Sequence, residues 1–254
     1  MSDAKLINGD CIKEMQKLID EGVKVDMVLT DPPYGTTACK WDTIIPFDMM
    51  WECLNSLTYD NTPIVLFGSE PFSSHLRLSN IKNYRYDWIW NKVRGSNFLN
   101  ANRTPLPAHE LISVFYKKMP LYNPQKRRVG VKYDKPITAT LRHNTYGGVK
   151  EGTPYIDDGT RYPLSIITCN KYKSEANNTN SSHPTQKPVE LLEYLIKTYT
   201  NEDDLVLDFT MGSGSTGVAC QNLNRDFIGI ELDKDYYNIA KQRINEAKAQ
   251  RRLI

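Results

Sequence analysis

The stretch Val206-Leu-Asp-Phe-Thr-Met-Gly-Ser-Gly-Ser-Thr-Gly217 decides the fold. An apolar run ends in Asp208, passes into a loop that contains Gly212 and Gly214, and continues into a segment with helical spacing. Glycines let the backbone turn tightly and approach a ligand closely, and the first turn of a helix offers free N–H groups. The stretch therefore predicts a strand, a ligand-binding turn and a helix, the arrangement typical of nucleotide-binding α/β proteins.

An acid follows this stretch at the distance expected of a ribose-binding carboxylate. The next strand-like run ends at Glu231, which follows Gly212 by 19 residues. In nucleotide-binding folds an acid about 20 residues after the first glycine accepts the ribose hydroxyls. Gly212-x-Gly214-x-x-Gly217 also matches the dinucleotide fingerprint. A nicotinamide-dependent oxidoreductase and a strand-to-helix turn without a ligand therefore stay open as alternatives.

Strand-like apolar runs alternate with helical segments along most of the chain. This alternation predicts an α/β fold with a doubly wound, mostly parallel sheet. The pattern is lost in the middle, where Pro, Gly, Asn, Thr and Tyr dominate, so we expect an inserted loop-rich region there. The expected strands are 5–8, 25–30, 64–68, 84–91, 111–116, 205–208 and 227–231, and the expected helices are 12–19, 47–57, 73–79, 189–199, 215–223 and 234–250.

A second motif, Asp31-Pro32-Pro33-Tyr34, directly follows the strand-like run 25–30. Two successive prolines fix the backbone and remove two N–H donors, while their carbonyls remain as acceptors. A carboxylate, a proline carbonyl and an aromatic ring suit a planar exocyclic amine, whose hydrogens they accept while the ring stacks on the base. The alternative is a rigid turn with Tyr34 as core filler. The position at the carboxyl end of a strand, where open α/β sheets bind ligands, favours the binding site.

Basic charge is concentrated in the middle of a nearly neutral chain. The 254 residues carry 32 Lys and Arg against 30 Asp and Glu, a net charge of +2. Residues 117–150 carry nine Lys and Arg and one acid, so this segment has +8 and the remainder −6. Interleaved tyrosines make the segment typical of regions that bind nucleic-acid phosphates. We expect a core at 1–117 and 183–254 and an inserted basic region at 118–182. The candidate DNA-binding cations are Lys126, Arg127, Arg128, Lys132 and Arg142.

The cysteines and histidines favour neither a disulfide framework nor a metal site. Five Cys form no C-x-x-C pair and four His lack the spacing of a zinc site, so we expect reduced thiols and no metal. The first residues lack an apolar signal core, and no apolar run approaches the ~18 residues that a membrane span needs. We therefore expect a cytoplasmic protein with no membrane partner.

Together, the two motifs resemble those of the S-adenosylmethionine-dependent DNA amino-methyltransferases, whose marks are Asp-Pro-Pro-Tyr and a Gly-Ser-Gly loop. Their order, with Asp-Pro-Pro-Tyr first, a basic region next and the glycine loop last, is similar to the permuted β class. His183-Pro-Thr-Gln-Lys-Pro188 and Asn8-Gly-Asp-Cys11 resemble two further family segments. The resemblance covers about residues 5–116 and 183–240 and implies a Rossmann-like methyltransferase fold with an inserted target-recognition region.

The resemblance implies catalytic roles for the second motif. Asp31 and the Pro32 carbonyl would accept hydrogens from the amine of a base flipped out of double-stranded DNA. Pro33 would keep the turn rigid and Tyr34 would stack on the base. Direct transfer of the methyl group agrees with the absence of a Pro-Cys nucleophile motif. Asp at the first position leans toward adenine N6, whereas Ser is commoner in cytosine-N4 enzymes, so cytosine stays open as an alternative.

The resemblance also implies a binding site for the cofactor, S-adenosylmethionine. The glycine loop would approach its methionine end, Lys187 and its neighbours would lie near its carboxylate, Glu231 would accept the ribose hydroxyls and Asp10 the adenine amine. The family usually has Asp-Pro-Phe where this chain has Asp208-Phe-Thr210, so we expect Thr210 not to supply the same apolar contact. The implied cofactor residues are Asp10, Cys11, Asp31, Thr185, Gln186, Lys187, Asp208, Thr210, Met211, Gly212, Ser213, Gly214, Ser215, Thr216 and Glu231.

Methylation of RNA or protein, and a DNA-binding module without catalysis, remain further alternatives. The permuted order and the central basic region favour DNA over the former, and the complete Asp-Pro-Pro-Tyr motif argues against the latter. Homodimers occur in the family and a restriction endonuclease can accompany such an enzyme. The resemblance therefore allows both partners, although no feature of the sequence points to either.

Overall fold

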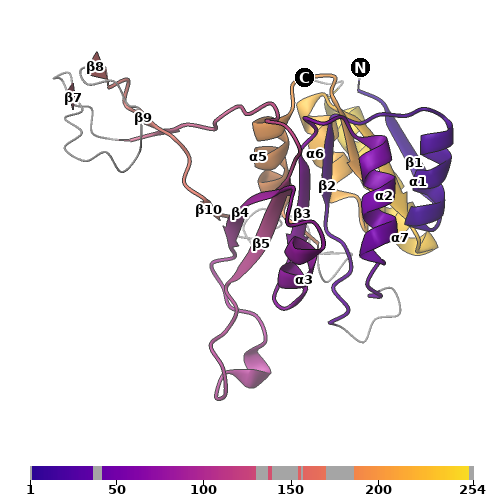
Figure 1. Cartoon of the computed structure of the whole chain (residues 1–254), viewed down its shortest axis with the longest axis horizontal. Coiled ribbons are helices and arrows are strands. Elements are labelled where there is room, and N and C mark those ends of the chain that lie inside the picture. Colours follow the sequence, from indigo (N-terminus) through magenta and orange to yellow (C-terminus); the bar gives the residue numbers. More distant parts are fainter. Residues whose placement is uncertain are drawn as a thin grey trace. The chain divides into compact units, whose positions relative to one another are not determined.

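A computed structural model describes residues 2–36, 42–129, 137–138, 154–155, 157–169 and 186–251. Its main feature is a sheet with helices packed on it (Figure 1). The strands of this sheet are β1 (Ala4–Asn8), β2 (Met27–Thr30), β3 (Ile64–Gly68), β4 (Tyr84–Asn91), β5 (His109–Phe115), β10 (Ile166–Thr168), β11 (Leu205–Asp208) and β12 (Asp226–Glu231). The α-helices are α1 (Cys11–Asp20), α2 (Phe47–Leu57), α3 (Phe72–Ser79), α5 (Val189–Tyr199), α6 (Ser215–Leu223) and α7 (Lys234–Arg251), and η1 (Phe98–Asn100) is a 3-10 turn.

The strands lie in the order β1-β12-β11-β2-β3-β5-β4-β10. Neighbouring strands are parallel except in the two pairs that β5 makes with β3 and β4. β5 can run against its neighbours because a loop, and not a crossover helix, joins it to β4. The doubly wound, mostly parallel α/β fold predicted from the sequence is confirmed.

Alternate side chains of the central strands pack on opposite faces of the sheet. On β11, Val206 packs in a buried cluster with α5, α6 and α7, whereas Leu207 packs in a cluster with α1, α2 and α3. Neither side chain is exposed. Helices thus cover both faces (Figure 1), which explains why these strands are apolar throughout and do not alternate with polar residues.

The connections after β11 and β2 lead to opposite faces. α6 joins β11 to β12 on one face, and α2 joins β2 to β3 on the other. Because β11 and β2 are neighbours, a crevice forms beyond their carboxyl ends, which is where open α/β sheets bind ligands. Both sequence motifs, residues 31–34 and 208–217, begin at this crevice.

The largest differences from the expected elements concern β10, β2 and β5, which begins at His109 and not at residue 111. Residues 166–168, which we expected in the inserted region, form β10 beside β4 at the edge of the sheet. Ile166 is 56% exposed, so this short edge strand lacks the apolar pattern by which buried strands are found. β2 begins at Met27, later than expected, because Val25 makes only an isolated bridge with Thr58.

Residues Pro124–Leu164 form a second compact unit, separate from the unit that contains the sheet. In its described part, β6 (Arg127–Arg128) pairs antiparallel with β9 (Thr160–Arg161), and β7 (Ile137–Thr138) pairs antiparallel with β8 (Pro154–Tyr155). These short ladders agree with the low content of regular structure expected for the insertion.

Of the five candidate DNA-binding cations, Lys126, Arg127 and Arg128 are described, and all three are exposed. Lys126 lies 4.8 Å from the centre of the Tyr162 ring and 3.7 Å from Asp158. Lys132 and Arg142 lie outside the described residues. No helix in the described part of the chain is long and apolar enough to cross a membrane.

Candidate active site

A cavity of about 860 Å³ opens where β1, β2, β11 and β12 end. Four of the acids that line it lie at or just beyond the carboxyl end of one strand each: Asp10, Asp31, Asp208 and Glu231. Because these strands are parallel, their carboxyl ends, and with them the four acids, lie at the same end of the sheet. Small-molecule sites usually measure about 300–1,000 Å³, so this cavity has room for a large ligand.

The Asp31-Pro32-Pro33-Tyr34 turn is held from both ends. The Tyr34 hydroxyl donates to the Asp31 carboxylate, and the Tyr34 ring lies 5.0 Å from the ring of Phe72, tilted by 32°. After the turn, the backbone N–H groups of Gly35 and Thr36 donate to the carboxylate of Asp42 at 2.8 and 2.9 Å. All four residues of the turn line the cavity.

The Asp31 carboxylate belongs to a chain of four alternating charges. The Lys187 ammonium donates to it and also lies 3.2 Å from Glu110, which in turn lies 3.3 Å from Lys92. The Lys187 side chain is 9% exposed and those of Glu110 and Lys92 are each 17% exposed. The chain is neutral in sum, which is what allows four charged groups to lie in a partly buried site.

Burial and neighbouring charges compete at each member of this charge chain. Burial raises the pKa of Asp31, and the nearby charge of Glu110 adds to the increase, while Lys187 acts against it. Burial also disfavours charged Lys187, but Asp31 and Glu110 outweigh burial and raise its pKa. For Glu110, the two lysines outweigh burial and lower the pKa. Lys187 therefore stays protonated and is the member that holds the two carboxylates together.

Asp208 joins the ends of β11 and β2. It is 3% exposed and accepts hydrogen bonds from the hydroxyl of Thr30, from the hydroxyl of Thr216 at 2.6 Å and from the N–H of Thr210 at 3.1 Å. The Thr210 hydroxyl donates to the backbone carbonyl of Asp31 at 3.1 Å. The glycine loop and the Asp31 turn are thus fixed to each other.

Burial raises the pKa of Asp208 to about 6, although three hydrogen bonds act against burial. A carboxyl group whose pKa is raised on folding stabilises the folded state less as pH rises from about 4 through about 6. Because the pKa of Asp208 increases from 3.8 to about 6, the loss in the free energy of unfolding amounts to about 3 kcal/mol. We expect Asp208→Asn to remove this part of the pH dependence. Urea unfolding of both proteins at pH 4.5 and 7.5 measures it, and parallel pH profiles would contradict the expectation.

The glycine loop is ordered by the acid at the end of β12. Glu231 accepts from the N–H groups of Gly212 and Asp233, each at 2.8 Å, and is 8% exposed. The carboxylate keeps acceptor capacity for further hydrogen bonds. The Gly9 N–H donates a hydrogen bond to the backbone carbonyl of Glu231 at 2.9 Å, which places the turn after β1 beside the end of β12.

Gly214 is required for packing. It adopts the left-handed conformation (φ 80°), and a Cβ there would lie 2.8 Å from the Cβ of Ala240 in α7. We expect Gly214→Ala to lower the free energy of unfolding by about 2–5 kcal/mol. Gly22 is the matched control, because its φ is 74° but a Cβ there would meet nothing within 4 Å. Gly22→Ala should cost only about 1–2 kcal/mol. Equal losses in urea unfolding would refute the packing role.

Cys11 lines the cavity beside Asp10, which caps α1 by accepting from the N–H of Lys13 at 3.1 Å. Burial, followed by the charge of Asp10, raises the pKa of Cys11 to about 12. The thiol therefore stays protonated at neutral pH.

Most residues predicted for the site line this cavity, with two differences. Gly214 does not line it, and Lys187, which we expect near a cofactor carboxylate, lines it and also contacts Asp31 and Glu110. Thr185 lies outside the described residues. The predicted residues that line the cavity are Asp10, Cys11, Asp31, Pro32, Pro33, Tyr34, Gln186, Lys187, Asp208, Thr210, Met211, Gly212, Ser213, Ser215, Thr216 and Glu231.

The family departure at residues 209–210 has a structural explanation. Phe209 is 1% exposed and packs in the core with α1, α2 and α3, so it does not face the cavity. Thr210 lines the cavity and makes the hydrogen bond to the Asp31 turn described above. The threonine thus provides a polar link between the motifs where the family usually has an apolar residue.

Sequence reasoning missed Glu110 and Lys92, which both line the cavity. Glu110 and Trp90 face each other across the antiparallel β4–β5 pair. No local motif contains them. The one signal was that β5 follows a polar loop, so the first residues of β5 had to lie at one end of the sheet, where strands begin or finish.

Comparisons with known proteins agree with this geometry. The family model described as DNA methylase matches residues 25–242. Type II methyltransferase M.HpaI of Haemophilus parainfluenzae is 30% identical over 258 residues, which cover 96% of this chain and 74% of the relative. Type II methyltransferase M1.MboII of Moraxella bovis is 27% identical, with 89% of this chain and 91% of the relative covered.

Solved structures show the same fold. The M1.HpyAVI–SAM complex matches with a TM-score of 0.64 and 26% identity, covering 95% of this chain and 99% of that one. PvuII DNA methyltransferase (cytosine-N4-specific) matches with a TM-score of 0.65, 98% of this chain and 93% of that chain covered, but only 14% identity, so this likeness concerns the fold alone.

The family match spans both sequence motifs and the strands that bring them together. It favours the methyltransferase interpretation of the glycine loop over the nicotinamide interpretation. The chain belongs to the N6/N4 DNA methylase family, the S-adenosylmethionine-dependent DNA amino-methyltransferases.

Proposed function

We propose that this enzyme transfers the methyl group of S-adenosylmethionine to the exocyclic N6 amine of an adenine flipped out of double-stranded DNA. The observation that carries the proposal is that Asp31, Glu231 and the glycine loop line one cavity. A base amine at Asp31 and a nucleotide cofactor at Glu231 would then be enclosed together, as a direct transfer requires.

The residues of the cavity fit the cofactor. Glu231 and Asp10 offer carboxylate oxygens to hydroxyl and amine groups, and Glu231 is held rigidly by two backbone N–H groups. The backbone of Gly212 and Ser213 lines the cavity without a bulky side chain between it and a ligand. When bound, S-adenosylmethionine supplies an electrophilic methyl group on a sulfonium sulfur.

The contribution of the protein is to hold and orient the base amine. The amine lone pair of adenine is delocalised into the ring and is a poor nucleophile. Hydrogen bonds from the amine to Asp31 and the Pro32 carbonyl favour a tetrahedral nitrogen with its lone pair directed at the methyl group. The Asp31 carboxylate would accept the proton that the amine nitrogen releases when it takes up the methyl group from the sulfonium, which would become a neutral thioether. Tyr34 would stack on the base.

The assignment to adenine is supported by Asp31. Aspartate at this position is the form that leans toward adenine, and the carboxylate is held by Tyr34 and Lys187 at the cavity wall. The DNA substrate is supported by the exposed cations of the second compact unit, Lys126, Arg127 and Arg128.

Sequencing that detects modified bases tests the proposal in cells that lack other methyltransferases. Expression of the wild-type chain should place N6-methyladenine at one recurring sequence of the cell's DNA, and expression of Asp31→Ala should leave most copies of that sequence unmethylated. N4-methylcytosine at a recurring sequence would contradict the adenine assignment. Unmodified DNA together with methylated RNA or protein would contradict the DNA assignment.

A further inference from the structure

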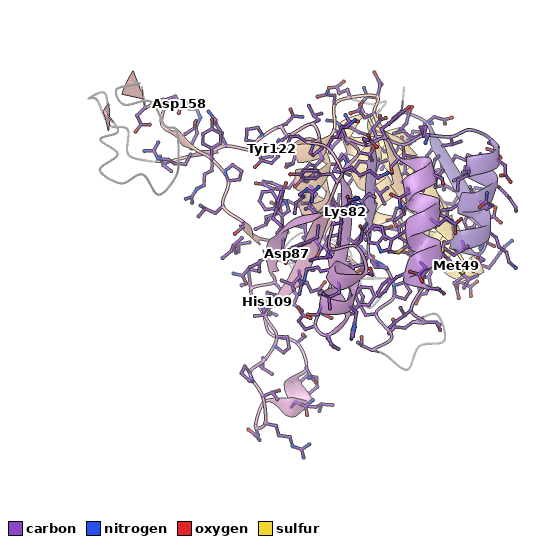
Figure 2. All side chains as sticks on the ribbon, in the orientation of Figure 1. Met49, Lys82, Asp87, His109, Tyr122 and Asp158 are labelled. Atoms are coloured by element: carbon purple, nitrogen blue, oxygen red, sulfur yellow. The ribbon has the colours of Figure 1, made fainter. Side chains whose placement is uncertain are left out.

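The loop between β4 and β5 carries the most exposed apolar pair in the described part of the chain. Phe98 is 76% exposed and Leu99 is 83% exposed. Both lie in η1, at the tip of this loop. Two backbone hydrogen bonds join the two arms of the loop: the Lys92 N–H donates to the Ala108 carbonyl at 2.8 Å, and the Ser96 N–H donates to the Pro107 carbonyl at 3.0 Å. Figure 2 shows the loop extending away from the sheet beyond His109.

The loop belongs to the wall of the cavity. Arg94, Gly95, Ser96 and Asn97 line the cavity, and the exposed pair follows directly after them in the chain. Asn97 is in the left-handed conformation (φ 63°), which turns the chain sharply before Phe98. An extended apolar tip therefore stands next to the space that would receive a flipped base.

The charge around the tip identifies its partner. Residues 93–108 contain Arg94 and Arg103, which are both exposed, and no Asp or Glu, whereas Lys92 is paired with Glu110. The lack of acids suits a surface that faces phosphates, whose negative charge repels carboxylates. Proteins that unstack DNA insert apolar side chains such as Phe and Leu between base steps, with cations on either side.

We propose that Phe98 and Leu99 form a wedge that enters the duplex and fills the gap left by the flipped base. The proposal rests on the proposed function, because it assigns these residues to the base-flipping step. Flipping costs the energy of unstacking and unpairing the target base. Apolar side chains in the gap would offset this cost by restoring contacts for the neighbouring bases. The wedge thus acts on DNA and does not touch the cofactor.

The test compares two duplexes that carry the recognition sequence found by sequencing. One has a normal pair at the target base, and the other has an abasic site opposite it, so that flipping breaks no base pair. Transfer of tritiated methyl from S-adenosylmethionine gives kcat/KM on each duplex. Phe98→Ala/Leu99→Ala should lower kcat/KM at least about tenfold on the paired duplex and less than about threefold on the abasic one. Cofactor affinity, measured by calorimetry, should not change.

Met119→Ala is the matched control. Met119 is as exposed as Phe98, at 76%. It follows the carboxyl end of β5, and because β5 is antiparallel to β3, this position lies at the end of the sheet opposite the cavity. It should match the wild type on both duplexes. Equal losses for the double variant on both duplexes, or no loss on either, would overturn the wedge. A change of the double variant from dimer to monomer with equal losses would identify a protein interface instead.

The outcomes separate this inference from the proposed function. If the wild type modified cytosine, the adenine assignment would fail, and the same pair of duplexes built around that cytosine would still test the wedge. If the wild type modified no DNA, both would fail.

Discussion

Asp31→Ala should lower kcat for methyl transfer to DNA by about 10²–10³-fold, the size of effect seen when a polar group that acts on the reacting atoms is removed. The carboxylate lies in the cavity wall at the end of β2 and would accept the amine hydrogens of the target base. Without it, the amine would remain conjugated with the ring and its lone pair would not be directed. Tritium transfer under saturating cofactor and DNA measures the loss.

Two controls separate catalysis from folding in this variant. Cofactor affinity should stay within about threefold of the wild type, because Lys187 keeps its ion pair with Glu110 when Asp31 is absent. Asp31→Asn retains one acceptor oxygen and should fall between the wild type and Asp31→Ala. Near-normal transfer by Asp31→Ala, or a loss of cofactor binding as large as the loss of kcat, would show that Asp31 does not hold the amine.

Lys187→Met should lower the free energy of unfolding by about 2–4 kcal/mol, because it leaves the carboxylates of Asp31 and Glu110 in a partly buried site without their shared cation. Their side chains are 26% and 17% exposed. The pKa of Asp31 should rise further when the ammonium that opposes burial is removed. Urea unfolding at pH 7.5 measures the change in stability.

Lys92→Met is the control for the loss of a single cation. Lys92 contacts only Glu110 within the charge chain, and Glu110 retains Lys187, so this variant should cost less than Lys187→Met. Adding Glu110→Gln to Lys187→Met should recover part of the lost stability, because one of the two opposing carboxylates is neutralised. If Lys187→Met changed stability by less than about 0.5 kcal/mol, the charge chain would have no structural role.

The parts of the fold that the sequence predicts are those with local signals. The strands Ile64–Gly68 and Leu205–Asp208 have the expected bounds, because each is an apolar run followed by a polar or glycine-rich turn. The carboxyl ends of parallel strands meet at one edge, so the motifs at residues 31–34 and 208–217 could be placed together before the structure was known. The direction of β5 had no such signal, since an antiparallel strand that is paired on both sides can be as apolar as a parallel one.

The charge chain could not be predicted, because it depends on contacts between distant residues. Lys187 and Asp31 are 156 residues apart in the chain. Glu110 and Lys92 approach them through the antiparallel pairing of β4 with β5, on either side of a long loop. The motif around Lys187 suggests a cofactor contact, and the two acids that contact the Lys187 ammonium lie in elements outside that motif. The role of Gly214 likewise follows from the position of α7, and not from the glycine fingerprint.

The central claim is that Asp31 directs methyl transfer to adenine N6 in DNA. Its most direct test is mass spectrometry of nucleosides from duplex DNA incubated with purified enzyme and S-adenosylmethionine bearing a deuterated methyl group. We predict deuterated N6-methyldeoxyadenosine with the wild type and, over the same initial time, at least about a hundredfold less with Asp31→Ala. Deuterium in N4-methyldeoxycytidine, or equal amounts of labelled N6-methyldeoxyadenosine from both proteins, would contradict the claim.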